Sequence, residues 1–396
     1  RARGQARREG EEGSAVQSLT PKTLAELAQA LSAAEVTDRD EYACIYQAAQ
    51  RYASEQPGQT DLSPVVSQQI VDKALALYHA VMALPHVENV QGCSAEMEKT
   101  YVYFANSAGT EGSASRQNTA LFVDAVAKIR DWTDSGWSFA IGKTLEEVDE
   151  HQVAKRAQEK AIEYYQAGRT QNGAMPIIFH GQAMVDLLGA FAPIFSAERA
   201  QKGMSQLAGK QGQKIAADCV TIVDTPDHPQ LGPGLPFDGE GVPTGVHTLV
   251  DHGVLKTLLY SLSSAKQDGV QSTGHGRRGY SGQVTIAPHV FTVQPGTQTL
   301  AELCAQAGHG VVIYEVSGLH AGVNDVSGDF SLLCKGRLIE NGAEGRAVEQ
   351  MVVSGNFFAM LQAITALGND TQYSIPGGSC YASPSVYVKE LAIAGN

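Results

Sequence analysis

The chain has 396 residues with 29 basic and 42 acidic side chains, so its formal net charge is −13. This length predicts about two to three domains and a sizeable buried core. A hydrophobic fraction of 43% excludes an intrinsically disordered chain, and a charged fraction of only 18% argues against a coiled coil. The acidic balance argues against nucleic-acid binding, because phosphate contacts need clustered Lys and Arg.

Membrane and secretion signals are not found in the sequence. The longest apolar stretch, near residues 187–197, is about half as long as the roughly 20 residues that a spanning helix needs. The six cysteines are scattered without a Cys-x-x-Cys pair, which is typical of a protein of the reducing cytoplasm. Because the chain does not start with Met, we expect part of its N-terminus to be missing.

The first part of the chain, residues 1–169, is predicted to be a mixed helix and strand domain that is incomplete at its start. Thr20 with Pro21, and later Ser63 with Pro64, are typical helix starts. Apolar residues follow each of them at helical spacing, so we expect two amphipathic helices whose apolar faces pack in the core.

The hydrophobic pattern then changes to a period of two, which predicts strands at 99–105, 121–130 and 138–142. The Asp-Ser-Gly sequence at 134–136 is expected to form the hairpin turn between the last two strands.

A helix is expected after these strands. Thr144 and Glu147 have the spacing of a capping box, and the helix should run to about Gln166 and stop at Gly168. The polar residues at 170–173 are the candidate domain boundary.

The second part, residues 174–396, is predicted to be mainly antiparallel sheet with a few helices, so the expected fold class is α+β. Strands are expected at 175–180, 219–224, 311–316, 330–334, 348–353 and 386–394, with a hairpin at 246–260 and helices at 182–195, 197–217, 300–307 and 356–367.

No single motif in the sequence identifies a reaction. A His-Glu-x-x-His pair is absent. His247 and His252 flank a hairpin turn and could approach each other, but no third ligand is visible, so we interpret them as exposed. Cys380 lies in a Gly-rich loop without a local His or cation partner, and we interpret it as a packing residue.

Two loops offer charged groups. Residues 274–279 match the pattern G-x-G-x-x-G, but a polar helix precedes them and a strand follows, which argues against a dinucleotide site. Arg277 and Arg278 in that loop are candidates for binding an acidic group such as a peptide carboxylate. Asp238 and Glu240 share another loop and could bind a hard cation, although solvated loop acids are commoner.

A series of short motifs follows in the second half, at 236–244, 253–260, 272–276, 322–324, 327–331, 339–342, 354–356, 367–370, 383–385 and 394–395. In this order the series resembles the TldD/PmbA family, the "modulator of DNA gyrase" proteins regarded as zinc-dependent peptidases. The resemblance is close over 175–396 and looser over 13–168. Family members usually carry a further N-terminal α/β segment, which this chain lacks or enters part-way.

The resemblance implies where zinc is bound in the TldD branch of the family. There a helix carries His-Glu-x-x-x-His, the zinc polarises the scissile carbonyl and activates water, and the Glu acts as general base. In this chain Gly189 and Ile194 stand at the positions of the His ligands, and Ala190 replaces the base.

The third zinc ligand in the family is a Cys that corresponds to a position near Tyr373 or Ser374, and Cys380 is out of register with it. The chain therefore resembles the PmbA (TldE) branch, the partner subunit without a zinc site.

The resemblance to this branch implies a cytoplasmic complex with a zinc-bearing TldD-type subunit that degrades or processes extended peptides. No cofactor and no catalytic residue are expected in this chain, and neither nucleic acid nor membrane is an expected partner. The candidate residues for the shared cleft or subunit interface are Asp238, Glu240, His275, Arg277, Asn324 and Asp329.

Two alternatives remain open from the sequence. The chain could be a stand-alone peptide-binding or scaffold homo-oligomer, or a self-sufficient hydrolase whose site the motifs do not reveal.

Overall fold

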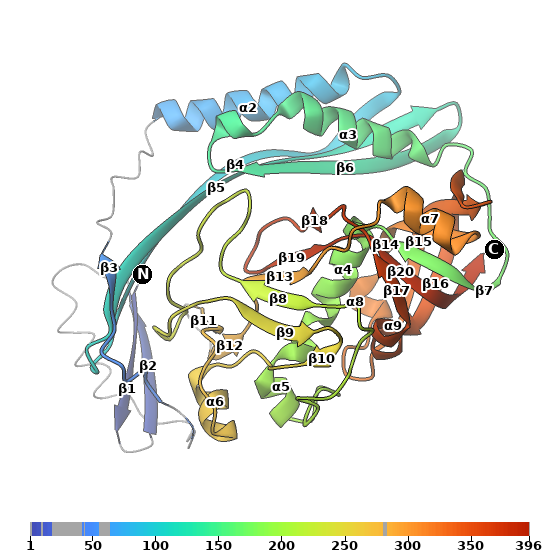
Figure 1. The fold of residues 1–396 in the computed structure, drawn as a ribbon. Helices are drawn as coiled ribbons and strands as arrows, with labels where there is room; N and C mark the ends of the chain where they lie inside the picture. The colour runs from blue at the N-terminus through green and yellow to red at the C-terminus, as the bar shows by residue number, and fades with distance from the viewer. Residues whose placement is uncertain are drawn as a thin grey trace.

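The computed structural model describes residues 2–8, 11–17, 42, 44–54, 64–279 and 283–395. Within them the chain folds into three sheets of four to six strands and two paired ribbons (Figure 1). The predicted α+β fold class is confirmed. The helix expected after Thr20 lies outside the described residues. Among the described helices, none is both long and apolar enough to cross a membrane.

The first sheet is long, curved and covered by two helices on one face (Figure 1). Its central strand pairs with a neighbour on each side, and a short strand joins its far end in parallel. The strands are β3 (Arg51–Ser54), β4 (Val87–Ala105), β5 (Glu111–Ile129) and β6 (Trp132–Gly142), and the helices are α2 (Pro64–Met82) and α3 (Glu150–Glu163).

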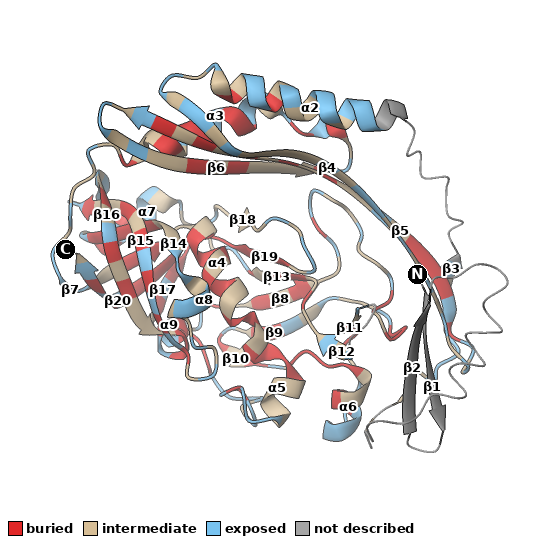
Figure 2. Cartoon of the chain, turned by 180° about the vertical axis from the view of Figure 1, so that it is seen from behind, coloured by how far each residue is buried: buried red, intermediate tan, exposed pale blue. Residues whose placement is uncertain are grey.

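A separate core holds these helices on the sheet. Leu77 of α2 and Ala157 of α3 pack with Leu121 and Val123 of β5, and all four are fully buried. Burying each large side chain contributes about 1.5–3 kcal/mol, so this core holds the two helices on the sheet. Figure 2 shows that buried and exposed positions alternate along parts of the long strands. The helix predicted after Ser63 is thereby confirmed.

The predicted hairpin turn at 134–136 is wrong. The chain turns at Arg130, which has a positive φ of 57°, and Gly136 lies inside β6 opposite Ala125. A Cβ atom at Gly136 would come within 2.3 Å of the backbone nitrogen of Ala161. The glycine therefore permits close packing of α3 on the sheet.

The expected capping box is also wrong. Thr144 makes no capping hydrogen bond and precedes only a 3-10 turn, η1 (Leu145–Glu147). Asp149 caps α3 instead, because its carboxylate accepts hydrogen bonds from two backbone N–H groups of the first turn. The helix ends at Glu163, before the predicted Gln166.

Five strands of the second half close into a barrel, because the first and the last of these five strands also pair with each other. Closure leaves those five strands without a free edge. In ring order they are β16 (Ala343–Asn356), β15 (Asp329–Glu340), β14 (Gly310–Ser317), β7 (Gly173–Phe179) and β20 (Val386–Gly395), with β17 (Ile364–Leu367) added to β20 and the helices α7 (Leu300–Ala307), α8 (Leu319–Gly322) and α9 (Phe357–Ala363) nearby.

The third sheet stands beside the barrel (Figure 1). Its strands in order are β10 (Val254–Leu255), β9 (His247–Asp251), β8 (Ile222–Thr225), β13 (Val290–Val293), β19 (Cys380–Ser383) and β18 (Gln372–Tyr373). A ribbon of β11 (Gly276–Arg278) and β12 (Val284–Ile286) and the helices α5 (Ala197–Gln201) and α6 (Leu262–Asp268) complete this region.

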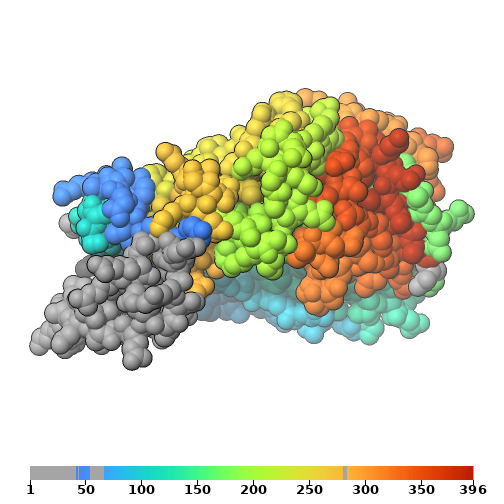
Figure 3. Space-filling model, turned by 90° about the horizontal axis from the view of Figure 1, so that it is seen from below, coloured from blue at the N-terminus to red at the C-terminus, as the bar shows by residue number. Residues whose placement is uncertain are grey.

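Helix α4 (Gly181–Phe191) lies between the barrel and the third sheet and continues as a 3-10 turn, η2 (Ala192–Phe195). Its side chains, Leu187 and Leu188 among them, belong to a large core shared by both. A helix that is apolar nearly all round must be buried. Seen from below, the barrel and the third sheet form one continuous body, with the long first sheet behind it (Figure 3).

The secondary structure of the second half departs from the predictions at three places. The helix expected at 197–217 is only α5, because Gly203 and Gly209 adopt positive φ values. The strand expected from Cys219 starts at Ile222. The helix expected at 356–367 ends at Ala363 and is followed by β17.

Candidate functional site

The positions that replace the zinc motif lie on and after helix α4. Gly189 and Ala190 border a hollow of about 360 Å³, whereas Ile194 is fully buried in the core. The helix changes to 3-10 geometry at Ala192, which turns Ile194 away from the hollow. The residues that line the hollow are Asp186, Gly189, Ala190, Leu319, His320, Val323 and Asp325.

The residues at this place do not fit a zinc ion held as the family motif would hold it. Gly, Ala and Ile offer no ligand atom, and a Cβ at Gly189 would come within 3.2 Å of the Tyr381 ring. Ser374 directly follows strand β18, which contacts α4, and its hydroxyl accepts a hydrogen bond from the Tyr381 N–H at 3.1 Å. Asp325, which lines the hollow, forms an ion pair with Arg199 at 2.5 Å.

Asp186 is the carboxylate on α4 nearest to these positions. Burial raises its pKa from 3.8 to about 6, while Lys160 of α3 opposes the shift. Burial likewise raises the pKa of Glu315 on β14, with Lys160 and Lys335 opposing. The hollow therefore adjoins a half-buried set of charges at the contact between the first sheet's helix α3 and the barrel.

Asp238 and Glu240, two predicted cleft residues, hold loops together. Both are about 7% exposed. The Asp238 carboxylate accepts hydrogen bonds from the backbone N–H groups of Glu240, Val242 and Gly276 at 2.8–2.9 Å. Glu240 accepts one from the Leu262 N–H at 2.8 Å, at the start of α6. Their carboxylates thus connect three segments.

The loop that carries these acids is anchored to the long sheet. The Tyr52 hydroxyl donates to the Gly241 carbonyl at 2.8 Å. The Phe237 ring lies 4.9 Å from the Tyr52 ring and 6.0 Å from the Phe104 ring, centroid to centroid. This contact joins the N-terminal sheet to the third sheet's loops.

The two arginines of the glycine-rich loop differ in their surroundings. Arg278 donates from Nε to the Gly239 carbonyl at 3.1 Å, so it supports the loop of the two acids. Burial lowers the pKa of Arg277, and Arg116 of β5 lowers it further. The loop forms the β11–β12 ribbon, which agrees with the argument against a dinucleotide site.

Asn324 and Asp329 shape the turn before β15, next to the hollow. The Asn324 side-chain oxygen accepts hydrogen bonds from the N–H groups of Val326 and Ser327, both at 3.1 Å. Asp329 accepts from the Ser327 hydroxyl at 2.8 Å and from the Asn356 amide at 2.9 Å. The six predicted cleft residues thus fall into two groups, one at the third sheet and one beside the hollow.

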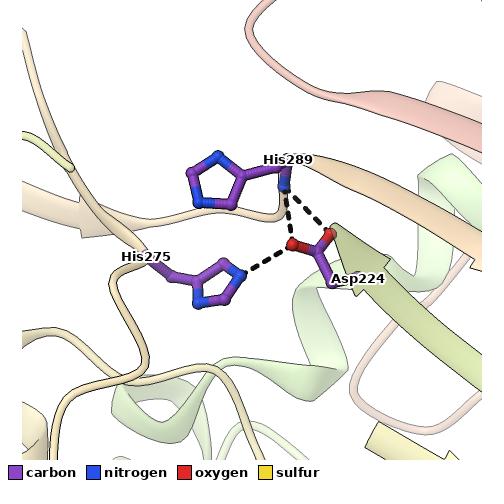
Figure 4. A group of neighbouring side chains, drawn as sticks. All are labelled: Asp224, His275 and His289. Atoms are coloured by element: carbon purple, nitrogen blue, oxygen red, sulfur yellow. Dashed lines mark hydrogen bonds and ion pairs between the residues drawn. The ribbon is translucent and has the colours of Figure 1, made fainter. Parts of the chain in front are cut away.

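A cluster of three potential metal ligands lies at the third sheet (Figure 4). Asp224, His275 and His289 each offer one ligand atom, and these atoms lie within 4.8 Å of one another; among the residues that the structure describes, this is the group found. His275 Nε2 is 2.8 Å from Asp224 Oδ2, and both side chains are 0% exposed.

Sequence reasoning found His275 but missed its two partners. Asp224 lies near the end of β8, His289 precedes β13, and 51 residues separate Asp224 from His275, so no local spacing marks the group. Of the two hairpin histidines interpreted as exposed, His252 is exposed, and its Nδ1 lies 2.8 Å from Asp251 Oδ1. His247 is half-buried instead, and its ring lies 5.3 Å from the His275 ring.

Two family models match the chain. Residues 60–164 match the PmbA/TldA metallopeptidase central domain, and residues 172–395 match the PmbA/TldA metallopeptidase C-terminal domain. The second match alone covers more than half of the chain.

Named relatives and solved structures agree with these matches. The Haemophilus influenzae metalloprotease PmbA homolog is 25% identical over 333 residues, 82% of this chain and 70% of the relative. A Thermotoga maritima protein described as a modulator of a DNA gyrase is 30% identical with a TM-score of 0.86, over 98% of this chain and 88% of the other. TldE from Thermococcus kodakarensis, at 24% identity, shares the fold with a TM-score of 0.84 over 99% and 89%.

Proposed function

The chain belongs to the PmbA/TldD family, and from this premise we propose that it is the TldE/PmbA-type subunit of a zinc metallopeptidase complex. In this proposal a TldD-type subunit supplies the zinc, and the pair degrades or processes extended peptides in the cytoplasm. The observation that carries the proposal is helix α4, where Gly189, Ala190 and the buried Ile194 occupy the places of two ligands and a base.

The packing around α4 supports the proposal that zinc ligands could not easily return to these positions. One His ligand could be regained by a single substitution at an exposed position, but Ile194 is 0% exposed and packs in the main core. Gly189 lies against the Tyr381 ring. A ligand at either position would require repacking of the core around the helix.

The part of the cleft that this chain contributes is, in the proposal, the hollow beside α4 together with strand β18. Extended peptides are commonly bound by adding a strand to a sheet edge. In the described sheet, β18 is the last strand on its side, and α4 contacts it. Asn324 and Asp329 would shape the opposite wall through the turn that they stabilise.

The test compares peptide cleavage by this chain alone, by a TldD-type partner from the same organism alone, and by the two together. We expect cleavage of an extended fluorogenic peptide only by the pair, and loss of that activity when the Glu of the partner's motif is replaced by Gln. Cleavage by this chain alone would instead indicate the self-sufficient hydrolase. Peptide binding that no partner converts to cleavage would indicate the scaffold homo-oligomer.

A matched pair of variants tests the contribution of the hollow. Ala190→Arg places a long cation in the hollow, and Ala301→Arg places the same side chain on the exposed first turn of α7. We expect the first to reduce cleavage by the pair at least about tenfold, equivalent to about 1.4 kcal/mol of transition-state stabilisation, and the second to leave it unchanged. Equal activity of both variants would place the substrate elsewhere.

A further inference from the structure

The cluster of Asp224, His275 and His289 is not used by the proposed function. We propose that it binds one divalent transition-metal ion of the zinc type, at a buried site that holds the third sheet to the β11–β12 ribbon. Two imidazole nitrogens and one carboxylate oxygen are a ligand set that suits such an ion. The proposal does not depend on the proposed function.

The first argument is convergence. The three side chains come from the end of β8, the loop before β11 and the segment before β13, and one ligand atom of each lies within 4.8 Å of the others. In Figure 4 the His275 ring faces the Asp224 carboxylate, and the centroid of the His289 ring lies 4.7 Å from that of the His275 ring. Asp224 and His275 are 0% exposed there. Burying a carboxylate and an imidazole together is costly unless each charge and each lone pair is compensated, and a metal ion compensates them all at once.

The second argument is the orientation of the rings. His289 Nε2 lies 2.9 Å from the Gly274 carbonyl, which only accepts, so Nε2 carries the proton and Nδ1 keeps its lone pair. His275 Nδ1 contacts the Thr273 hydroxyl at 2.9 Å, which leaves Nε2 to face Asp224. Histidines that bind metals characteristically give their other nitrogen to a carbonyl, carboxylate or hydroxyl in this way.

The third argument is that Asp224 is itself held in place. Its carboxylate accepts the His289 backbone N–H at 3.0 and 3.2 Å, so the ligand is oriented by the same residue whose side chain is the third ligand.

A further histidine and two opposite charges lie beside the cluster, and His247 is not one of the three residues whose ligand atoms converge. The His247 ring is 5.3 Å from the His275 ring, and His247 has a hydrogen bond with the Thr273 backbone. The Asp238 carboxylate interacts electrostatically with His275, and Arg277 does so with Asp224. The negative charge of Asp238 and the positive charge of Arg277 offset each other. Asp224 therefore supplies most of the negative charge that would balance the ion.

Metal binding needs a small rearrangement of the cluster, in which the closest pair of ligand atoms separates and the more distant atoms approach. Zinc–nitrogen bonds of about 2.0–2.1 Å place tetrahedral ligand atoms about 3.3 Å apart. The atoms here lie within 4.8 Å, and the closest pair is 2.8 Å apart. The ion would displace the proton between His275 and Asp224, and the ring of His289 would have to move toward them. Asp224 and His275 are buried and His289 is half-buried, which favours a structural ion over one that meets substrate.

The test starts with the full chain treated with a chelator and then given Zn²⁺ or Co²⁺ alone. We expect close to one equivalent of zinc by elemental mass spectrometry after gel filtration. The Co²⁺ form should show the visible absorption of a low-symmetry site with nitrogen and oxygen ligands. Less than a tenth of an equivalent would overturn the proposal and leave the cluster as a hydrogen-bonded network.

Variants locate the ion. His289→Gln keeps a donor for the Gly274 carbonyl but loses the ligand nitrogen, so we expect affinity to fall at least about 100-fold while unfolding in chelator stays unchanged. His320→Gln removes the histidine of the hollow beside α4 and should leave affinity unchanged. Loss of the ion in His320→Gln alone would overturn the proposal by moving the site to the hollow. Peptide cleavage does not enter this test, so its outcome is separate from that of the proposed function.

Discussion

Two neighbouring places in the second half of the chain differ in the side chains that they present. At the hollow beside α4, the family resemblance leads one to expect ligands, and Gly189 and Ala190 stand instead. At the other place, Asp224 and His275 form a buried pair that no sequence motif indicates. Both are close in space, because Asp224 and Tyr381 are each in register with Phe291 and Tyr381 covers Gly189.

The difference lies in what surrounds each place. On α4, Ile194 packs in the core, whereas Gly189 and Ala190 border the hollow. In the cluster, the rings are held by hydrogen bonds to the Gly274 carbonyl, the Thr273 hydroxyl and the Asp224 carboxylate. Substitutions at the two places should therefore have different consequences.

The largest effect is expected for Asp224→Ala in the metal-free chain. The change removes the acceptor of His275 Nε2 and of the His289 N–H, and leaves both donors buried without a partner. We expect a loss of about 2–5 kcal/mol in the free energy of unfolding, measured with urea. Asp224→Asn retains one acceptor and should lose less. A decrease in the free energy of unfolding below about 1 kcal/mol would mean that water replaces the carboxylate. The cluster would then tolerate substitution as easily as the hollow.

The second effect contrasts two positions of the degenerate motif. Ile194→His puts a polar ring into a fully buried site and should cost about 2–4 kcal/mol, whereas Ala190→Glu faces the hollow and should cost less than about 1 kcal/mol. Urea unfolding of both variants gives the comparison. Equal costs would show that the end of α4 adapts easily and that packing does not prevent the return of a ligand.

The sequence predicted most elements of the second half because their patterns are local. The strands of the barrel and the helix at 300–307 were predicted from the hydrophobic pattern, and the structure adds a capping box of Thr299 and Glu302 at the start of α7. Closure of the barrel could not be predicted, since it depends on the pairing of β16 with β20, some 40 residues apart in the chain.

The sequence failed where a residue serves a distant contact. Gly136 belongs to an Asp-Ser-Gly sequence that is typical of turns, but it lies in a strand because α3 packs against it. Asp238 and Glu240 have the appearance of solvated acids, but they bind backbone amides of other loops. Asp224 and His289 carry no local signal at all, because only the tertiary fold brings them to His275.

The third effect concerns the pH dependence at the hollow. Burial raises the pKa of Asp186 to about 6, above the ordinary 3.8, so the folded state binds this proton more tightly than the unfolded state. The stabilisation is complete below the unfolded pKa and is lost as the pH rises through about 6. Relative to Asp186→Asn, the wild type should therefore lose about 1–3 kcal/mol between about pH 4 and 7.

The control for this prediction is Asp218→Asn, at a carboxylate whose side chain is 82% exposed. This control makes the same Asp-to-Asn change at the surface, and its pH profile is the baseline for the Asp186 variant. If the Asp186 variant behaves like the control, water reaches Asp186 freely and the hollow is more open than its lining indicates.

The smallest effect tests whether Cys380 belongs with the hollow or with the core. Burial raises the pKa of its thiol, and the residue is 4% exposed, whereas Cys219 is exposed. A thiol reagent should therefore label Cys219 at least about 100-fold faster than Cys380, whose reaction waits for local opening. Cys219→Ser should remove the fast phase of labelling.

Repeating the thiol labelling in the presence of zinc tests the comparison between the hollow and the cluster. An ion held by Asp224, His275 and His289 leaves the Cys380 thiol uncoordinated, and the slow labelling rate should change only as far as the ion stabilises the whole fold. In His289→Gln, saturating zinc should then have no effect on that rate. If zinc still protects Cys380 in this variant, the thiol is itself a ligand. Cys380 would then be a cysteine ligand of the kind that the family's zinc site uses. The difference drawn between the hollow and the cluster would be wrong.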